Sequence, residues 1–187
     1  MTRRLRTVTT PIAGLFAVER EPIGDARGWL ERLYCPEELR AAIGPATIAA
    51  VNRTRTARAG TVRGLHFQQA PHAEDKLVTC LRGRVFDVAV DLRRGSPTFL
   101  GFHAEILDGD GRRSLLIPKG FAHGFQALTD GCELLYLHTA PHAPEAEGGL
   151  DALDPALAIP WPLPVTDRSP RDLSHRPIDR TFTGIGP

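Results

Sequence analysis

Glycine and proline divide this chain into short segments, and this punctuation constrains its fold more than any other feature of the sequence. The 187 residues include 18 glycines and 16 prolines, and the segments between them are rich in Val, Ile, Leu, Phe and Thr. Short β-prone segments separated by turn residues are typical of all-β proteins. We therefore expect antiparallel strands that form a closed or sandwiched sheet.

The same pattern predicts nine strands and one helix. The strands are expected over residues 14–20, 46–54, 61–68, 76–82, 84–91, 99–107, 113–117, 122–127 and 132–139. A helix is expected over 36–43, because Pro36 would occupy its first turn and Gly44 would follow its end. Residues 81–85 predict a hairpin turn centred on Gly83, since glycine accepts the positive φ that such turns need.

Length and composition indicate one domain over residues 1–187. At 42% hydrophobic residues the chain can bury one sizeable core. The strands place this core at about residues 10–145. After Pro144 the composition shifts towards Pro, Asp and Arg without strand periodicity, so residues 146–187 are expected to form an irregular tail that wraps the core.

Charge and cysteine content restrict the partners and the compartment. The net charge is +1, from 23 basic and 22 acidic residues, so no global field would recruit nucleic acid or a membrane surface. The longest apolar runs are too short to cross a bilayer. Cys35, Cys80 and Cys132 are odd in number and lack metal-ligand spacing, which favours free thiols in the cytoplasm.

His66 is the leading candidate for a general base. It alternates with apolar neighbours in residues 62–68, and imidazole is the side chain best suited to moving protons near neutral pH. Arg63 precedes it by three residues and Lys76 follows it by ten. A proton acceptor with two fixed cations suits a reaction in which negative charge develops.

The segments GLH (64–66) and PKGFAHGF (118–125) are similar to the two short motifs of cupin barrels. A metal-dependent cupin usually takes His-x-His and Glu from the first motif and another His from the second. Here Gln68 stands where the second histidine would lie, so only His66 and His123 could be ligands. We expect a site without metal and without another cofactor.

Longer motifs carry a resemblance to one family and cover most of the chain. The chain resembles the dTDP-4-dehydrorhamnose 3,5-epimerases in RGLHF (63–67), KLV (76–78), GRVFDVAVDLR (83–93), GSPTF (95–99), IPKGFAHGF (117–125) and LY (135–136). The resemblance implies an all-β jelly-roll barrel with one or two short helices. It also implies a homodimer that epimerises a dTDP-4-keto-6-deoxy sugar at carbons next to the ketone, in deoxysugar biosynthesis.

The resemblance also implies roles for individual residues. His66 would remove the α-proton, Lys76 would stabilise the enolate oxygen, and Tyr136 would return a proton from the opposite face. The remaining residues would bind the substrate: Arg63 at the diphosphate, Asn52, Gln68 and His123 in the pocket, and Arg27 of the DARG segment (25–28) at the nucleotide of the partner subunit.

Several positions depart from the family pattern. The dyad aspartate of a Ser-x-Lys/Arg-Asp segment aligns with Ser169 in VTDRS (165–169), so Ser169 itself, Asp167, Asp172 or Asp87 are the candidates to support His66. A family glutamate aligns with Arg32, although Glu31 lies next to it, and a family glutamine aligns with Ala50. A second active-site tyrosine aligns with His142.

Three functions therefore stay open on the sequence. The first is a dTDP-4-keto-6-deoxyhexose epimerase. The second is an isomerase or cyclase that uses the same barrel and base on a carbonyl compound without a nucleotide. The third is a binding protein that keeps the fold but lacks catalysis.

Overall fold

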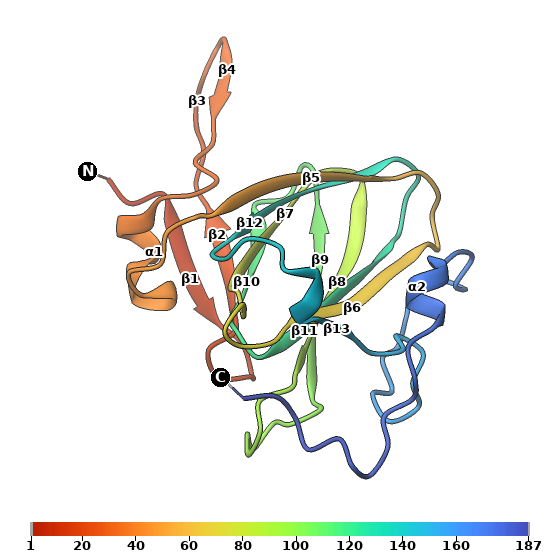
Figure 1. Cartoon of the computed structure of the whole chain (residues 1–187). Coiled ribbons are helices and arrows are strands. Elements are labelled where there is room, and N and C mark those ends of the chain that lie inside the picture. The colour runs from red at the N-terminus through yellow and green to blue at the C-terminus, as the bar shows by residue number, and fades with distance from the viewer. Residues whose placement is uncertain (1, 187) are drawn as a thin grey trace.

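Two antiparallel sheets face each other in a computed structural model that describes residues 2–186 (Figure 1). In the order in which they pair, the strands of the first sheet are β1 (Leu5–Thr9), β2 (Phe16–Arg20), β10 (Arg113–Ile117), β7 (Lys76–Arg82), β12 (Cys132–His138) and β5 (Ala50–Thr56). Those of the second are β13 (Glu147–Gly149), β6 (Val62–Gln68), β11 (Phe121–Ala127), β8 (Arg84–Asp91) and β9 (Phe102–Asp108). The expected all-β jelly-roll barrel is confirmed.

Smaller elements surround the barrel. The helix expected over 36–43 is present as α1 (Pro36–Ile43), which ends at Gly44. A two-stranded hairpin of β3 (Ile23–Asp25) and β4 (Gly28–Leu30) projects away from the barrel (Figure 1). The others are the 3-10 turn η1 (Pro144–Ala146) and the short helix α2 (Pro170–Leu173).

Some strand boundaries differ from the predictions. The strand expected from residue 99 begins at Phe102, because the hydroxyls of Ser96 and Thr98 both donate to Asp91 and hold the preceding residues in turns. The strand expected from residue 46 begins at Ala50. Strands β1 and β13 lie outside the predicted core of about 10–145, yet each pairs with a barrel strand, β2 and β6 respectively.

The core lies between the sheets and contains side chains from both. Val78 and Leu134 come from the first sheet, and Val85 and Phe125 from the second, and all four are almost completely buried. Burial of such side chains contributes about 1.5–3 kcal/mol each.

A pair of glycines lets two strands of the second sheet approach closely. Gly64 in β6 has a φ of 108°, and a Cβ added there would lie 2.6 Å from the carbonyl oxygen of His123 in β11. A Cβ at Gly124 would in turn lie 2.7 Å from the carbonyl oxygen of Arg63. A side chain at either position would push the strands apart. The two glycines lie where the pairing of β6 and β11 is irregular, next to the position at which His66 lies opposite His123.

The C-terminal tail returns to the edge of the second sheet. Val62 of β6 donates its backbone N–H to the carbonyl of Asp167, and Thr61 and Asp167 form a parallel bridge. Helix α2 follows directly and lies beside β6 (Figure 1). The start of α2 and the segment before it thus pack against β6. None of the helices in the described residues is long and apolar enough to cross a bilayer.

Candidate active site

A cavity of about 330 Å³ opens between the two sheets and brings together most of the side chains singled out in the sequence. The second sheet contributes His66 and His123, and the first contributes Lys76 and Tyr136. The full lining is Asn52, Thr54, Arg63, His66, Phe67, Gln68, Glu74, Lys76, His123, Phe125, Tyr136, His138, His142 and Glu147. The candidate base therefore faces the candidate cation and acid across one space.

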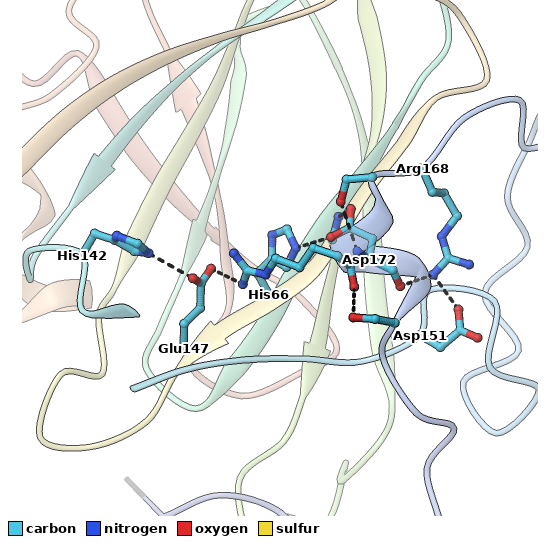
Figure 2. A network of polar contacts seen from close by, with 10 residues as sticks. His66, His142, Glu147, Asp151, Arg168 and Asp172 are labelled. Carbon is cyan, nitrogen blue, oxygen red and sulfur yellow. Dashed lines mark hydrogen bonds and ion pairs between the residues drawn. The ribbon is translucent and has the colours of Figure 1, made fainter. Parts of the chain in front are cut away.

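His66 forms a dyad with Asp172, the third residue of α2. Its Nε2 lies 2.7 Å from Asp172 Oδ1, and Figure 2 shows the ring turned towards this carboxylate. Burial alone would raise the pKa of Asp172, but the hydrogen bond and charge of His66 outweigh it and lower the pKa to about 2. The ionised carboxylate accepts the Nε2 proton, so Nδ1 is the nitrogen left to accept a proton.

Asp172 is held in place by three further contacts. Its Oδ2 accepts the backbone N–H of Gly64 at 3.2 Å, and its own N–H donates to Ser169 Oγ at 3.0 Å. Arg168 donates to the Asp172 carbonyl and to Asp151, which anchors the start of α2 to the preceding loop (Figure 2). The carboxylate is 3% exposed, and such a fixed partner sets the orientation of the imidazole.

The other three candidates for supporting His66 have different partners in the structure. Ser169 is the N-cap of α2 and accepts a hydrogen bond from Asp172, so its hydroxyl supports the aspartate instead of the histidine. Asp167 pairs at the surface with Arg58 at 3.3 Å. Asp87 is fully buried and lies 2.8 Å from Nε2 of His123.

A signal for Asp172 is present in the sequence. The residues Ser169-Pro170-Arg171-Asp172 themselves fit the Ser-x-Lys/Arg-Asp pattern. The aspartate of this pattern therefore lies three residues after the position expected for it, and Ser169 is the serine of the pattern.

Tyr136 lies deep in the cavity wall. It is 9% exposed, and its ring contacts the ring of His123 edge-on at 5.9 Å between centroids. Burial raises the pKa of Tyr136 well above its ordinary value, with the charge of Asp87 acting in the same direction. The phenol therefore stays protonated near neutral pH, which suits a proton donor.

Arg63 and Asn52 lie where an anionic ligand could reach them. Both side chains line the cavity and both residues are exposed. Arg63 forms no ion pair within residues 2–186. Its guanidinium is therefore available to pair with an anionic group of a ligand.

Two other predicted binding residues are engaged by the protein itself. Gln68 is buried, donates to the carbonyls of His72 and Pro141, and accepts the N–H of Ala143. Its amide thus fastens the loops at the wall of the cavity that it lines, and its role in substrate binding stays a prediction. His142 lies at the exposed rim and pairs with Glu147 at 3.0 Å (Figure 2).

The nucleotide-site positions on the N-terminal part of the chain lie away from this cavity. Arg27, at the turn of the β3–β4 hairpin, has an 89% exposed side chain and pairs only with Asp25 among the described residues. Arg32 pairs with Glu38, and Glu31 pairs with the buried Arg20.

One trio of possible metal ligands occurs within residues 2–186. His66, Asp172 and His175 each offer an atom within 4.8 Å of the others. However, the ligand atoms of His66 and Asp172 are only 2.7 Å apart. Ligands of one zinc ion at about 2.1 Å would be more than about 3 Å from each other. The arrangement is that of a direct hydrogen bond with a neighbouring ring.

A jelly-roll barrel with an imidazole–carboxylate dyad, an opposing lysine and a buried tyrosine defines a class of cupin-like acid–base enzymes. Comparison with known proteins places the chain within it: the sequence model of the dTDP-4-dehydrorhamnose 3,5-epimerases matches residues 9–180. The chain belongs to this family.

Individual relatives agree with this assignment. The chain is 41% identical over 162 residues to the dTDP-4-dehydrorhamnose 3-epimerase of Streptomyces niveus, covering 86% of this chain and 78% of the relative. It is 43% identical over 152 residues to the dTDP-4-dehydrorhamnose 3,5-epimerase of Streptomyces griseus, covering 81% and 75%.

A solved structure extends the match to three dimensions. The dTDP-6-deoxy-D-glucose-3,5-epimerase of Legionella pneumophila, in complex with dTDP-4-keto-L-rhamnose, superposes with a TM-score of 0.89 at 36% identity. The match covers 97% of this chain and 98% of that one.

Proposed function

We propose that this protein is an epimerase that inverts a carbon next to the ketone of a dTDP-4-keto-6-deoxyhexose in deoxysugar biosynthesis. The observation that carries the proposal is the placement of His66, which lies on the second sheet and pairs with Asp172 of α2, across one cavity from Lys76 and Tyr136 on the first sheet. The relatives named above act, by their names, on such sugars.

The reaction consists of two proton transfers. Nδ1 of His66 takes the α-proton, the C–H electron pair forms an enolate, and Asp172 stabilises the resulting imidazolium. The Lys76 ammonium stabilises the enolate oxygen, a contribution of about 3–4 kcal/mol for a preorganised donor. Tyr136 then donates its proton to the other face of the carbon, which inverts the configuration, and solvent restores both groups to their starting states.

The two alternative functions, a non-catalytic protein and an enzyme for a carbonyl compound without a nucleotide, have less support. A non-catalytic member was considered because the dyad aspartate was missing, and Asp172 supplies it. A carbonyl substrate without a nucleotide would leave Arg63 without an anionic partner. The three cysteines are free thiols, which supports the proposal that the reaction takes place in the cytoplasm.

Incubation with dTDP-4-keto-6-deoxy-D-glucose in deuterated water tests the proposed reaction. We expect deuterium to enter the sugar next to the ketone, and mass spectrometry with proton NMR would give the number and position of the exchanged carbons. dTDP-glucose, which has no ketone, is the control and should exchange nothing. The proposal fails if the keto sugar remains unlabelled at high enzyme concentration.

We further propose that the protein acts as a homodimer through the β3–β4 hairpin and the edge strand β5 of the first sheet. The hairpin exposes Ile23, Trp29 and Leu30 at 50%, 72% and 67%, and the edge strand β5 exposes Val51 at 59%. Large exposed apolar side chains and an unpaired edge favour association. Arg27 at the tip of the hairpin would then reach the nucleotide bound to the partner subunit.

Light scattering on a sizing column tests the dimer. The wild type should elute at twice the 20.4 kDa of one chain, and Leu30→Glu should shift it to the monomer, because a charge is costly in an apolar interface. Leu153→Glu changes a residue that is also exposed, at 47%, but lies in the loop after β13, and it should leave the dimer intact. A monomeric wild type would contradict the proposal.

A further inference from the structure

Glu74 is a buried carboxylate in the cavity wall that the proposed reaction does not use. It lies two residues before β7, and its side chain is 8% exposed. Its Oε1 lies 3.2 Å from Nζ of Lys76, and its Oε2 lies 2.8 Å from Nδ1 of His138. One carboxylate thus bridges a cation and an imidazole, and all three side chains line the cavity.

The strand register places the two partners of Glu74 side by side. Lys76 and His138 are directly opposite each other in the antiparallel pair of β7 and β12. The ring of His138 also stacks on Tyr136, with 5.9 Å between centroids and 20° between planes, because residues two apart in a strand share a face. A continuous set of contacts therefore runs from Lys76 through Glu74 and His138 to Tyr136.

The segment that carries Glu74 is itself anchored. Its neighbour Asp75 accepts the backbone N–H of Lys119 at 3.0 Å and the hydroxyl of Thr139 at 3.2 Å. Asp75 also donates its own N–H to Thr139 Oγ1 and accepts, through its carbonyl, the N–H of Thr139. These bonds tie the start of β7 to the end of β12 and fix the backbone from which Glu74 reaches inwards.

Glu74 is negatively charged in this setting. Burial alone would raise its pKa, but the hydrogen bond to His138 and the charge of Lys76 outweigh it, so the pKa lies below the ordinary value. An ionised carboxylate forms a charge-assisted hydrogen bond with an adjacent ammonium and restricts its position. A lysine has four rotatable side-chain bonds, so an unanchored ammonium would spread over many positions.

We propose that Glu74 is a positioning residue, which clamps the Lys76 ammonium and the His138 ring against the cavity so that both face the substrate. The catalytic meaning of this clamp rests on the function proposed above. The oxyanion then forms against a cation whose place is already set, and the ring behind Tyr136 is fixed in the same way. Preorganisation of this kind lowers the barrier without tightening nucleotide binding.

The clamp can be measured without activity, because the chain contains only two lysines, Lys76 and Lys119. Lys119 is exposed and provides an internal reference. Acetylation by a limiting amount of sulfo-N-hydroxysuccinimide acetate, followed by peptide mass spectrometry, gives the ratio of the two labelling rates. In Glu74→Gln, which keeps the side-chain shape, we expect labelling of Lys76 relative to Lys119 to rise about ten-fold. An unchanged ratio would overturn the clamp.

Kinetics then test what the clamp contributes to the reaction. Glu74→Gln should lower kcat for α-proton exchange about 10- to 100-fold, while the dissociation constant of dTDP stays within about two-fold, because Arg63 is untouched. Glu74→Asp restores the charge and should recover part of the rate. Glu145→Gln removes a carboxylate that is 71% exposed and outside the cavity lining, and it should behave like the wild type.

The outcomes separate this inference from the function on which it rests. A lowered kcat with an unchanged melting temperature supports the positioning role, and an unchanged kcat overturns it. If the wild type exchanges no proton, labelling of Lys76 relative to Lys119 can still rise in Glu74→Gln. In that case the proposed reaction is wrong, but the positioning of Lys76 by Glu74 is supported.

Discussion

Replacing His66 with asparagine should lower the rate of α-proton exchange by about 10²- to 10⁴-fold, the usual contribution of a general base. Asparagine approximates the ring's size and keeps a polar group near Asp172, but it cannot accept the α-proton. The measurement is deuterium incorporation into dTDP-4-keto-6-deoxy-D-glucose, followed by mass spectrometry. Binding of dTDP should change little, because the nucleotide contacts are assigned to other residues.

A matched variant separates loss of the base from loss of a histidine in general. His103→Asn alters a histidine in β9 that pairs with Glu105 and lies outside the cavity lining. It should leave the exchange rate unchanged. Retention of the wild-type rate in His66→Asn would mean that another group removes the proton, and the proposed mechanism would be wrong.

Replacing Asp172 with asparagine should also lower kcat by about 10²- to 10⁴-fold. The amide is the same size as the carboxylate, but it cannot stabilise the imidazolium, and it can hold the ring in the wrong tautomer. Asp167→Asn is the matched control, because the side chain of Asp167 pairs only with Arg58 at the surface among the described residues. If Asp167→Asn lowered kcat more than Asp172→Asn, the assignment of Asp172 as the dyad carboxylate would be wrong.

Asp172 also couples stability to pH. Its pKa of about 2 in the folded chain lies below that of an unfolded aspartate, so the carboxylate contributes about 2 kcal/mol of stability above about pH 4. This contribution is lost as the pH falls towards 2. Denaturant titrations of the wild type and Asp172→Asn should therefore give free energies of unfolding that differ at neutral pH and converge at low pH.

The barrel strands were predictable because their signals are local. Alternation of apolar residues and the turn glycines define β6, β7 and β8 within one or two residues of their observed bounds. Strand β1 was missed because its two apolar residues, Leu5 and Val8, do not alternate, and β13 because two of its three residues are glycine. Both form by pairing with strands distant in sequence, which a local pattern does not report.

The site was predictable where chemistry and strand periodicity agree. His66, Lys76 and Tyr136 were all selected from strands, and all three line the cavity. His138 was missed although it lies two residues after Tyr136 and therefore on the same face of β12. Asp172 was misassigned because its position depends on the docking of α2 against β6, a contact between segments more than 100 residues apart.

The C-terminal position of the dyad carboxylate makes the site depend on the last part of the chain to be synthesised. All strands of the barrel are complete by Gly149, whereas Asp172 arrives later, on a helix held by a cap, an arginine and one backbone contact to Gly64. The same tail also packs Leu157 and Ile185 into the core of the second sheet. The last part of the chain therefore completes both the core and the dyad, so a truncation before α2 would remove the partner of His66 together with part of the packing beneath it.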